Sequence, residues 1–428
     1  MELYLTMRRR ADFPFNMDCT PEDMPVDVAL RALDVAAASK SPQILLRGNE
    51  PLLHPDLEMV LKGFRKRGII PVIETSGLMP SMAKRLIREY HCRLIWRLYR
   101  PSLYSPEDLE EMKANLKEFS DGTITVRLVV MVDDMSADYG FVREYLDNYE
   151  FEANLWRFSC LHDQADFSPV MALISDLMRE YIGKNLVPAL ACGVMPCAMT
   201  DAQFGFMAKV GGKYARCIPH LGVLPDGRVC HCQAMRMLPG PHISTFKNEG
   251  ELHQYYIDVF ISLQWQLSFC PECNGCPCLS AGLCTGVSMA KKAHGMLAKY
   301  EELKAKLAAE QGELSDEARM KLLWEMSEVC MILGLYPDAI ECLEEIRRQA
   351  PENGKCHFYL GVCYWETGSL AEGEDEFRKC ARLSDNPLPA LNELFNRFVK
   401  NGNTIRARLL QGEIEKEELK LREAQRKS

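Results

Sequence analysis

The chain has 428 residues, of which 47% are hydrophobic and 26% charged, a balance typical of a folded globular protein with two to four domains. Its net charge is -9, and basic residues are mixed with acidic ones, which argues against nucleic acid as the main partner. No long apolar stretch is present in the sequence, so we expect no membrane span, no secretion and a cytoplasmic location. In a reducing cytosol, 18 cysteines indicate metal ligands or buried thiols rather than disulfides.

From residue 1 to residue 165, short apolar runs alternate with segments of helical periodicity, as in repeated βα units that form a parallel sheet. Val26–Ala38 and Asp56–Arg67 are two such helical segments, with apolar residues three and four positions apart. This part is therefore predicted to be an α/β domain. Its predicted strands are Glu2–Met7, Gln43–Arg47, Ile69–Thr75, Cys92–Tyr99, Ile124–Val132 and Asn154–Cys160.

Residues 166–290 differ in composition, because they hold ten of the 18 cysteines together with Gly-Gly, Pro-Asp-Gly and Pro-Gly turns. A small, loop-rich domain of this kind usually needs a metal to hold it together. We therefore predict a second domain that binds metal through thiolates. The candidate ligands are Cys192, Cys197, Cys217, Cys230, Cys232, Cys270, Cys273, Cys276, Cys278 and Cys284.

The spacing of these cysteines favours shared metal centres. Cys270, Cys273 and Cys276 recur at every third residue, so that one loop can present several thiolates to one centre. Between Cys217 and Cys232, two short strands around a Pro-Asp-Gly turn predict a hairpin that would bring the two sulfur atoms together at its open end. Thiolates bind both iron–sulfur clusters and zinc, and the spacing alone favours iron only slightly.

Residues 291–319 are predicted to contain a charged connecting helix. From 320 to 428 the chain repeats every 34 residues, with small residues five positions after each of three glycines, Gly334, Gly368 and Gly402. This register resembles the tetratricopeptide repeat, in which small residues let two antiparallel helices approach closely. The resemblance implies three helical repeats, a polar capping helix and a surface that binds a protein or peptide. The cysteines within the repeats lie at helical spacing and are predicted to be core residues, namely Cys330, Cys342, Cys356, Cys363 and Cys380.

The segment from Cys217 through GVLPDGRVCHC to the cysteines at 270–284 resembles the SPASM domain, which extends many peptide-modifying radical SAM enzymes. In that family the cysteines bind auxiliary [4Fe-4S] clusters, so the resemblance implies one or two such clusters here, with zinc as the alternative. By matching, Cys217 and Cys232 fall in the first site. Cys270, Cys273 and one or more of Cys276, Cys278 and Cys284 fall in the second site or are shared between both. The family's first cysteine has no clear counterpart, although Cys192 or Cys197 could supply it, and Cys276 and Cys278 are closer together than usual.

The first 165 residues correspondingly resemble the radical SAM partial (β/α)6 barrel, except at its catalytic loop. In that family three cysteines after the first strand bind the cluster that cleaves S-adenosylmethionine. Arg9, Phe13 and Asn16 stand at those positions here, and Cys19 remains alone nearby. A guanidinium and a phenyl ring cannot ligate iron, so the resemblance implies that the S-adenosylmethionine-cleaving cluster is absent.

A second motif of the radical SAM family has a similar counterpart in this sequence. Gly48-Asn49-Glu50-Pro51 follows an apolar strand and resembles the family's Gly-Gly-Glu-Pro motif, whose glutamate contacts the methionyl amine. Glu50 is therefore a candidate relic of a cofactor site, and Asn49 replaces a glycine that lets the backbone approach a ligand. Without the cluster, a plain carboxylate at a strand end is the favoured interpretation of Glu50.

Three functions follow as hypotheses. In the first, the chain is a non-catalytic iron–sulfur protein that relays electrons to, or holds, an active radical SAM maturase, and its repeats bind that partner or a peptide. In the second, an auxiliary cluster with an open iron performs the chemistry itself. In the third, zinc stabilises a scaffold whose functional part is the repeats. Metal analysis separates the third from the other two.

Overall fold

The computed structural model describes residues 1–14, 16–17, 22–134, 136–158, 186–190, 221–263, 273–281, 284, 289–309 and 315–427, with a few isolated residues between 172 and 205. The chain forms two compact units, Met1–Ala293 and His294–Ser428. Within the described residues, no helix combines the length and the apolar character that crossing a lipid bilayer requires.

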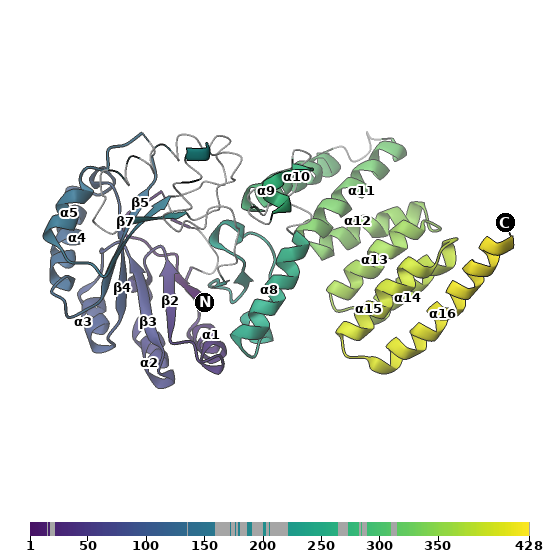
Figure 1. Ribbon diagram of the computed structural model, residues 1–428, viewed down its shortest axis with the longest axis horizontal. Helices are drawn as coiled ribbons and strands as arrows, with labels where there is room; N and C mark the ends of the chain where they lie inside the picture. Colours follow the sequence, from purple (N-terminus) through teal and green to yellow (C-terminus); the bar gives the residue numbers. More distant parts are fainter. Residues whose placement is uncertain are drawn as a thin grey trace. The chain divides into compact units, whose positions relative to one another are not determined.

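The first unit is built on a sheet whose strands follow one another in the order β7-β6-β5-β4-β3-β2-β1-β8-β9 (Figure 1). Neighbouring strands from β1 to β7 are parallel, and so are β1 and β8, whereas β9 is antiparallel to β8. The strands are β1 (Glu2–Thr6), β2 (Gln43–Gly48), β3 (Ile70–Thr75), β4 (Arg93–Leu98), β5 (Val126–Val132), β6 (Ala153–Phe158), β7 (Leu186–Leu190), β8 (Gly222–Val223) and β9 (Val229–Cys230).

Each crossover from β1 to β6 carries a helix, and Figure 1 shows these helices along one side of the sheet. This one-sided arrangement follows because the strands are added in one direction and parallel crossovers are right-handed. The helices are α1 (Val26–Ala38), α2 (Leu57–Arg67), α3 (Ser81–Glu89), α4 (Pro106–Phe119) and α5 (Val142–Asn148). Their apolar faces form the main core with alternate residues of the strands, such as Leu46, Ile73 and Trp96.

The predicted α/β domain is thus confirmed, with strands that agree with the sequence to within two residues over the described part. The sheet nevertheless differs from the six strands expected. β7 adds a seventh parallel strand that the sequence did not indicate, and the β8–β9 hairpin extends the opposite edge beside β1. The hairpin had been expected in a separate cysteine-rich domain, but its backbone bonds join it to the sheet, beginning with Glu2 N to Leu221 O at 2.8 Å.

Three helices follow β9 in the chain, namely α8 (Glu249–Leu263), α9 (Pro277–Ser280) and α10 (Met289–Ala309), of which α10 crosses the boundary between the two units. α10 corresponds to the predicted charged connecting helix. Short 3-10 turns lie at Pro51–Leu53, Pro101–Leu103, Gln233–Met235 and Ile243–Thr245.

The second unit consists of consecutive helices that pack in pairs. Gly334, Gly368 and Gly402 each follow the first helix of a pair in a left-handed conformation, with φ of 75°, 87° and 69°. A Cβ atom on Gly361 would lie 3.0 Å from the ring of Phe377, so this glycine allows close helix packing. The helices are α11 (Asp316–Leu333), α12 (Tyr336–Gln349), α13 (Gly354–Glu366), α14 (Leu370–Leu383), α15 (Leu388–Lys400) and α16 (Thr404–Lys427).

Candidate functional site

The carboxyl ends of β1, β2 and β3 meet at one edge of the sheet, which is where parallel α/β proteins place their ligands. Glu50 follows β2 and Ser76 follows β3, while the loop after β1 carries Phe13. The backbone N–H of Glu50 donates to the carbonyl oxygen of Arg8 at 3.1 Å. The structure therefore places Glu50 directly against the loop that follows β1.

Phe13 is packed into the protein rather than exposed on this loop. Its ring lies parallel to that of Tyr99, with 4.0 Å between ring centroids, and edge-on to Tyr104 at 5.0 Å. All three side chains are buried, with 6% of Phe13 exposed. Aromatic pairs in these geometries stabilise a fold beyond the area that they bury. The loop is thus anchored to the end of β4 by an aromatic cluster.

The two other matched positions also hold the loop together. Arg9 pairs with Asp12, 3.4 Å away, and the side-chain amide of Asn16 donates to the carbonyl oxygen of Ala11 at 3.0 Å. Cys19 lies outside the described residues. None of the three matched side chains offers a thiolate to a metal.

Asn49 is buried and uses its whole amide group to hold the two ends of the loop. Its Nδ2 donates to the carbonyl oxygens of Met7 and Met17 at 2.6 and 2.7 Å, and its Oδ1 accepts from the N–H of Met17 at 2.6 Å. The preceding Gly48 has φ of 130°, and a Cβ atom there would lie 2.1 Å from the carbonyl oxygen of Thr6. Asn49 therefore fixes the two ends of the loop after β1 to each other.

Glu50 is 2% exposed, and only one of its carboxylate oxygens is satisfied. Oε2 accepts from the N–H of Ser76 at 2.9 Å and from its hydroxyl at 2.7 Å, whereas Oε1 has no hydrogen-bond partner within the described residues. Burial raises the pKa of Glu50, although the nearby Arg97 and the bonds from Ser76 act in the opposite direction. A buried acid in this state is suited to an uncharged form or to a cationic partner.

Sequence reasoning missed a row of charges beside Glu50, of which Glu74 and Arg97 are buried and Glu2 and Arg47 partly buried. Arg47 pairs with Glu2 at 2.7 Å and with Glu74 at 3.3 Å, and Glu74 lies 3.9 Å from Arg97. Arg97 also donates to the carbonyl oxygen of Asn49. These residues come from β1 to β4 and alternate with the apolar residues of the main core, so they lie on the sheet face opposite to it. A charged residue within an apolar strand, repeated in neighbouring strands, was the signal available in the sequence.

The raised pKa of Glu50 predicts a specific pH dependence. A carboxyl whose pKa is higher in the folded chain stabilises the fold most below its unfolded pKa, and this contribution is lost as pH rises through the folded pKa. We therefore expect the Glu50→Gln variant to gain stability relative to the unmodified chain between pH 5 and about pH 8. Urea unfolding across this range measures the difference. A variant that becomes progressively less stable than the unmodified chain as pH rises would show that the ionised carboxylate is favourable here.

The hairpin predicted around Pro-Asp-Gly is present, with its turn at Gly227, whose φ is 81°. Cys230 ends β9 and is buried against Tyr4 and Leu224. Burial raises the pKa of the Cys230 thiol, which is the behaviour of a packed thiol. Cys232 is partly exposed, and the predicted approach of Cys217 to it concerns a residue outside the described part of the chain.

The other predicted ligands are described only in part. Cys273, Cys276, Cys278 and Cys284 are partly exposed, and backbone hydrogen bonds join Cys276 to Cys273 and Cys284 to Cys278, each at 3.1 Å. Among the residues that the structure describes, no three Cys, His, Asp or Glu side chains are grouped to hold a metal. The metal site therefore stays a prediction, because four of its ten residues lie outside the described ranges: Cys192, Cys197, Cys217 and Cys270.

The cysteines of the helical unit are buried, as their spacing predicted. Burial raises the pKa of several of these thiols to about 12, Cys330 and Cys363 among them. Such thiols remain protonated at neutral pH and pack as small apolar side chains.

Comparison with known proteins gives similarity to solved structures alone, since no family model matches the sequence and no curated protein matches it significantly. Streptococcus suis SuiB bound to S-adenosylmethionine aligns over 59% of this chain and 64% of its own, with a TM-score of 0.44 and 16% identity. SuiB bound to its precursor peptide SuiA also aligns over 59% of this chain and 64% of its own, with a TM-score of 0.42 and 13% identity. The anSMEcpe structure with bound AdoMet aligns over 65% of this chain and 86% of its own, with a TM-score of 0.46 and 12% identity. This chain spans just under two thirds of the length of SuiB.

Proposed function

We propose that the chain is an iron–sulfur protein of the radical SAM/SPASM type that does not cleave S-adenosylmethionine. It acts instead as an electron-relay or scaffold partner of an active radical SAM maturase. The observation that carries this proposal is the packing of Phe13, which stands at one matched thiolate position, stacks on Tyr99 and lies edge-on to Tyr104. A cluster that holds S-adenosylmethionine needs three thiolates from this loop, and the three matched positions hold Arg9, Phe13 and Asn16, none of which supplies one.

The polar groups around the loop support the same proposal, because they bind the protein itself. The side-chain amide of Asn49 is hydrogen-bonded to Met7 and Met17, and one carboxylate oxygen of Glu50 accepts a hydrogen bond from Ser76. In a site built for the methionyl group of S-adenosylmethionine, the position of Asn49 would leave the backbone open to the ligand. The residues here do not fit that ligand or its cluster.

The cysteines of 192–284 provide the donors for the auxiliary clusters in this proposal. Thiolates suit one or two [4Fe-4S] clusters, and five of the six described cysteines are partly exposed. When bound, such clusters would supply one-electron transfer. The helical pairs of the second unit would bind the maturase or a peptide, as repeat surfaces commonly do.

The test is metal analysis of the full chain after anaerobic purification. We expect about four or eight irons per chain with matching sulfide, and a loss of iron when Cys270 and Cys273 are both replaced by alanine. Cys363→Ala is the control, since this thiol is buried in the helical unit and its replacement should leave the iron content unchanged. Zinc without sulfide would instead support a metal-stabilised scaffold and would remove the electron-relay role.

A further inference from the structure

A basic cavity lies at the edge of the helical unit where α12 and α14 end. Its volume is about 630 Å³, and it is lined by the cations Arg347, Arg348, Lys379 and Arg382 together with His357 and Leu383. This volume falls in the range of pockets that bind ligands, roughly 300–1,000 Å³. Four cationic side chains around one cavity favour an anionic occupant.

The carboxylates nearby neutralise only part of this charge. The buried Glu376 accepts from Arg347 at 3.0 Å, from Lys379 at 2.9 Å and from the imidazole of His357 at 2.5 Å. Arg347 and Lys379 are thereby fixed in the wall. Arg348 and Arg382 are exposed and form no ion pair with any described residue. Arg348 and Arg382 therefore carry the exposed positive charge of this cavity, with Glu345 and Asp375 near enough to interact with them.

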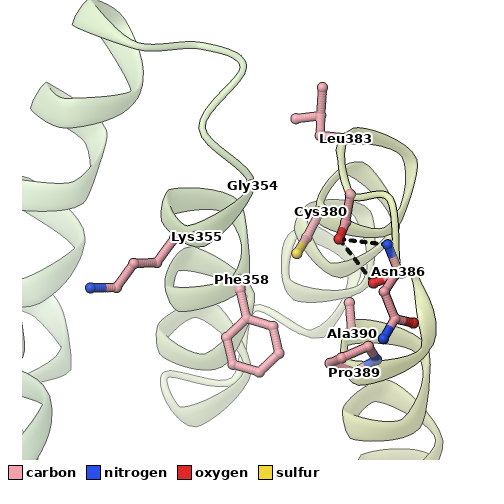
Figure 2. A pocket seen from close by; sticks show the side chains of 9 residues that line it. Gly354, Lys355, Phe358, Cys380, Leu383, Asn386, Pro389 and Ala390 are labelled. Carbon is pink, nitrogen blue, oxygen red and sulfur yellow. Dashed lines mark hydrogen bonds between the residues drawn. The ribbon is translucent and has the colours of Figure 1, made fainter.

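A second cavity of about 290 Å³ adjoins the first and shares Leu383 with it. Figure 2 shows Phe358, Cys380 and Ala390 around this space, while Lys355 directs its ammonium group away from it. That ammonium group lies 3.0 Å from Glu328 and over the ring of Trp324. The second cavity is therefore mainly apolar, and Leu383, 43% exposed, separates it from the basic one.

We propose that these two cavities form one docking groove for an acidic peptide segment that carries a bulky apolar side chain. Carboxylates of the peptide pair with Arg348 and Arg382, and the apolar side chain enters the cavity beside Phe358. A peptide is favoured over a small anion because an inorganic anion gains no favourable contact from the adjoining apolar cavity, whereas an apolar side chain of a peptide can be buried there. The inference rests on the proposed role of the helical unit in binding a partner, and it names the face and chemistry of that binding.

The experiment uses the full chain and a fluorescein-labelled glutamate-rich peptide with one central phenylalanine, followed by fluorescence anisotropy. We expect saturable binding that weakens between ~50 and ~200 mM salt, because the cationic side chains of Arg348 and Arg382 are exposed to screening. Replacing both Arg348 and Arg382 with glutamate should weaken binding about tenfold or more. The matched control is Lys400→Glu with Arg408→Glu, which makes the same change in net charge on exposed residues of α15 and α16.

Leu383→Ala separates a peptide groove from an anion site. This variant should weaken binding of the phenylalanine probe about fivefold and leave a probe with serine at that position unaffected. The proposal would be overturned if the Arg348 and Arg382 double variant and the Lys400 and Arg408 control lost equal amounts of peptide affinity. It would also be overturned if inorganic phosphate competed fully with the peptide and Leu383→Ala had no effect on peptide binding. Thermal unfolding verifies that each variant is folded. Failure here leaves the iron content unchanged, so it is distinguishable from failure of the proposed function.

Discussion

Replacing Phe13 with alanine is expected to lower the free energy of unfolding by about 3–5 kcal/mol, the usual loss for a buried phenylalanine. The ring is 6% exposed and contacts both Tyr99 and Tyr104, so its removal leaves a cavity and ends two aromatic contacts. Urea unfolding measures the loss, and near-ultraviolet circular dichroism reports the change in aromatic packing.

Phe13→Leu is the matched control, because it keeps much of the apolar volume and removes only the ring contacts. Its loss should be about 1–2 kcal/mol. If the alanine variant loses less than about 1 kcal/mol, the loop is not anchored by this side chain. The main support for a loop unable to hold a cluster would then be gone.

Replacing Asn49 with glycine is expected to destabilise the fold by about 2–4 kcal/mol, since it removes three hydrogen bonds of a buried amide. The carbonyl oxygens of Met7 and Met17 and the N–H of Met17 would lose these partners. We also expect faster amide hydrogen exchange in the loop, because Asn49 joins its two ends.

Two other substitutions test this interpretation of Asn49. Asn49→Asp keeps an acceptor for the N–H of Met17 but places a carboxylate opposite two carbonyl oxygens, so it should be at least as destabilising as glycine. Asn115→Ala removes an amide that makes one described hydrogen bond, to the carbonyl oxygen of Gly77, and should be destabilising by about 1 kcal/mol. An Asn49→Gly variant as stable as the unmodified chain would mean that the loop holds its place without this side chain.

The sequence was a good guide to the α/β part because each strand is a short apolar run between helical segments of clear period. The strands Gln43–Gly48 and Ile70–Thr75 each differ from the predicted strand by one residue at one end, and the helix Val26–Ala38 agrees with its prediction at both ends. The three glycines at intervals of 34 residues were equally informative, since each ends a helix in a conformation that favours glycine.

The other features of the fold and of the candidate site depend on contacts between residues far apart in the sequence, which local sequence patterns do not indicate. The stack of Phe13 on Tyr99 joins residues from two loops, and the charges of Glu2, Arg47 and Glu74 meet only because neighbouring strands are in register. β7 is short and contains a proline, which argues against a strand in isolation. The cysteine spacing gave candidate donors but could not show which sulfur atoms meet, because folding decides that over long sequence separations.

The proposal that the chain does not cleave S-adenosylmethionine is tested most directly by product analysis of the anaerobic, iron-loaded full chain with dithionite and S-adenosylmethionine. We expect no 5′-deoxyadenosine above the level in a sample without protein, because no three thiolates after β1 can hold the required cluster. The Glu50→Gln variant should give the same result. Formation of more than about one equivalent of 5′-deoxyadenosine per chain, abolished by Glu50→Gln, would contradict the proposal and establish the chain as a catalyst.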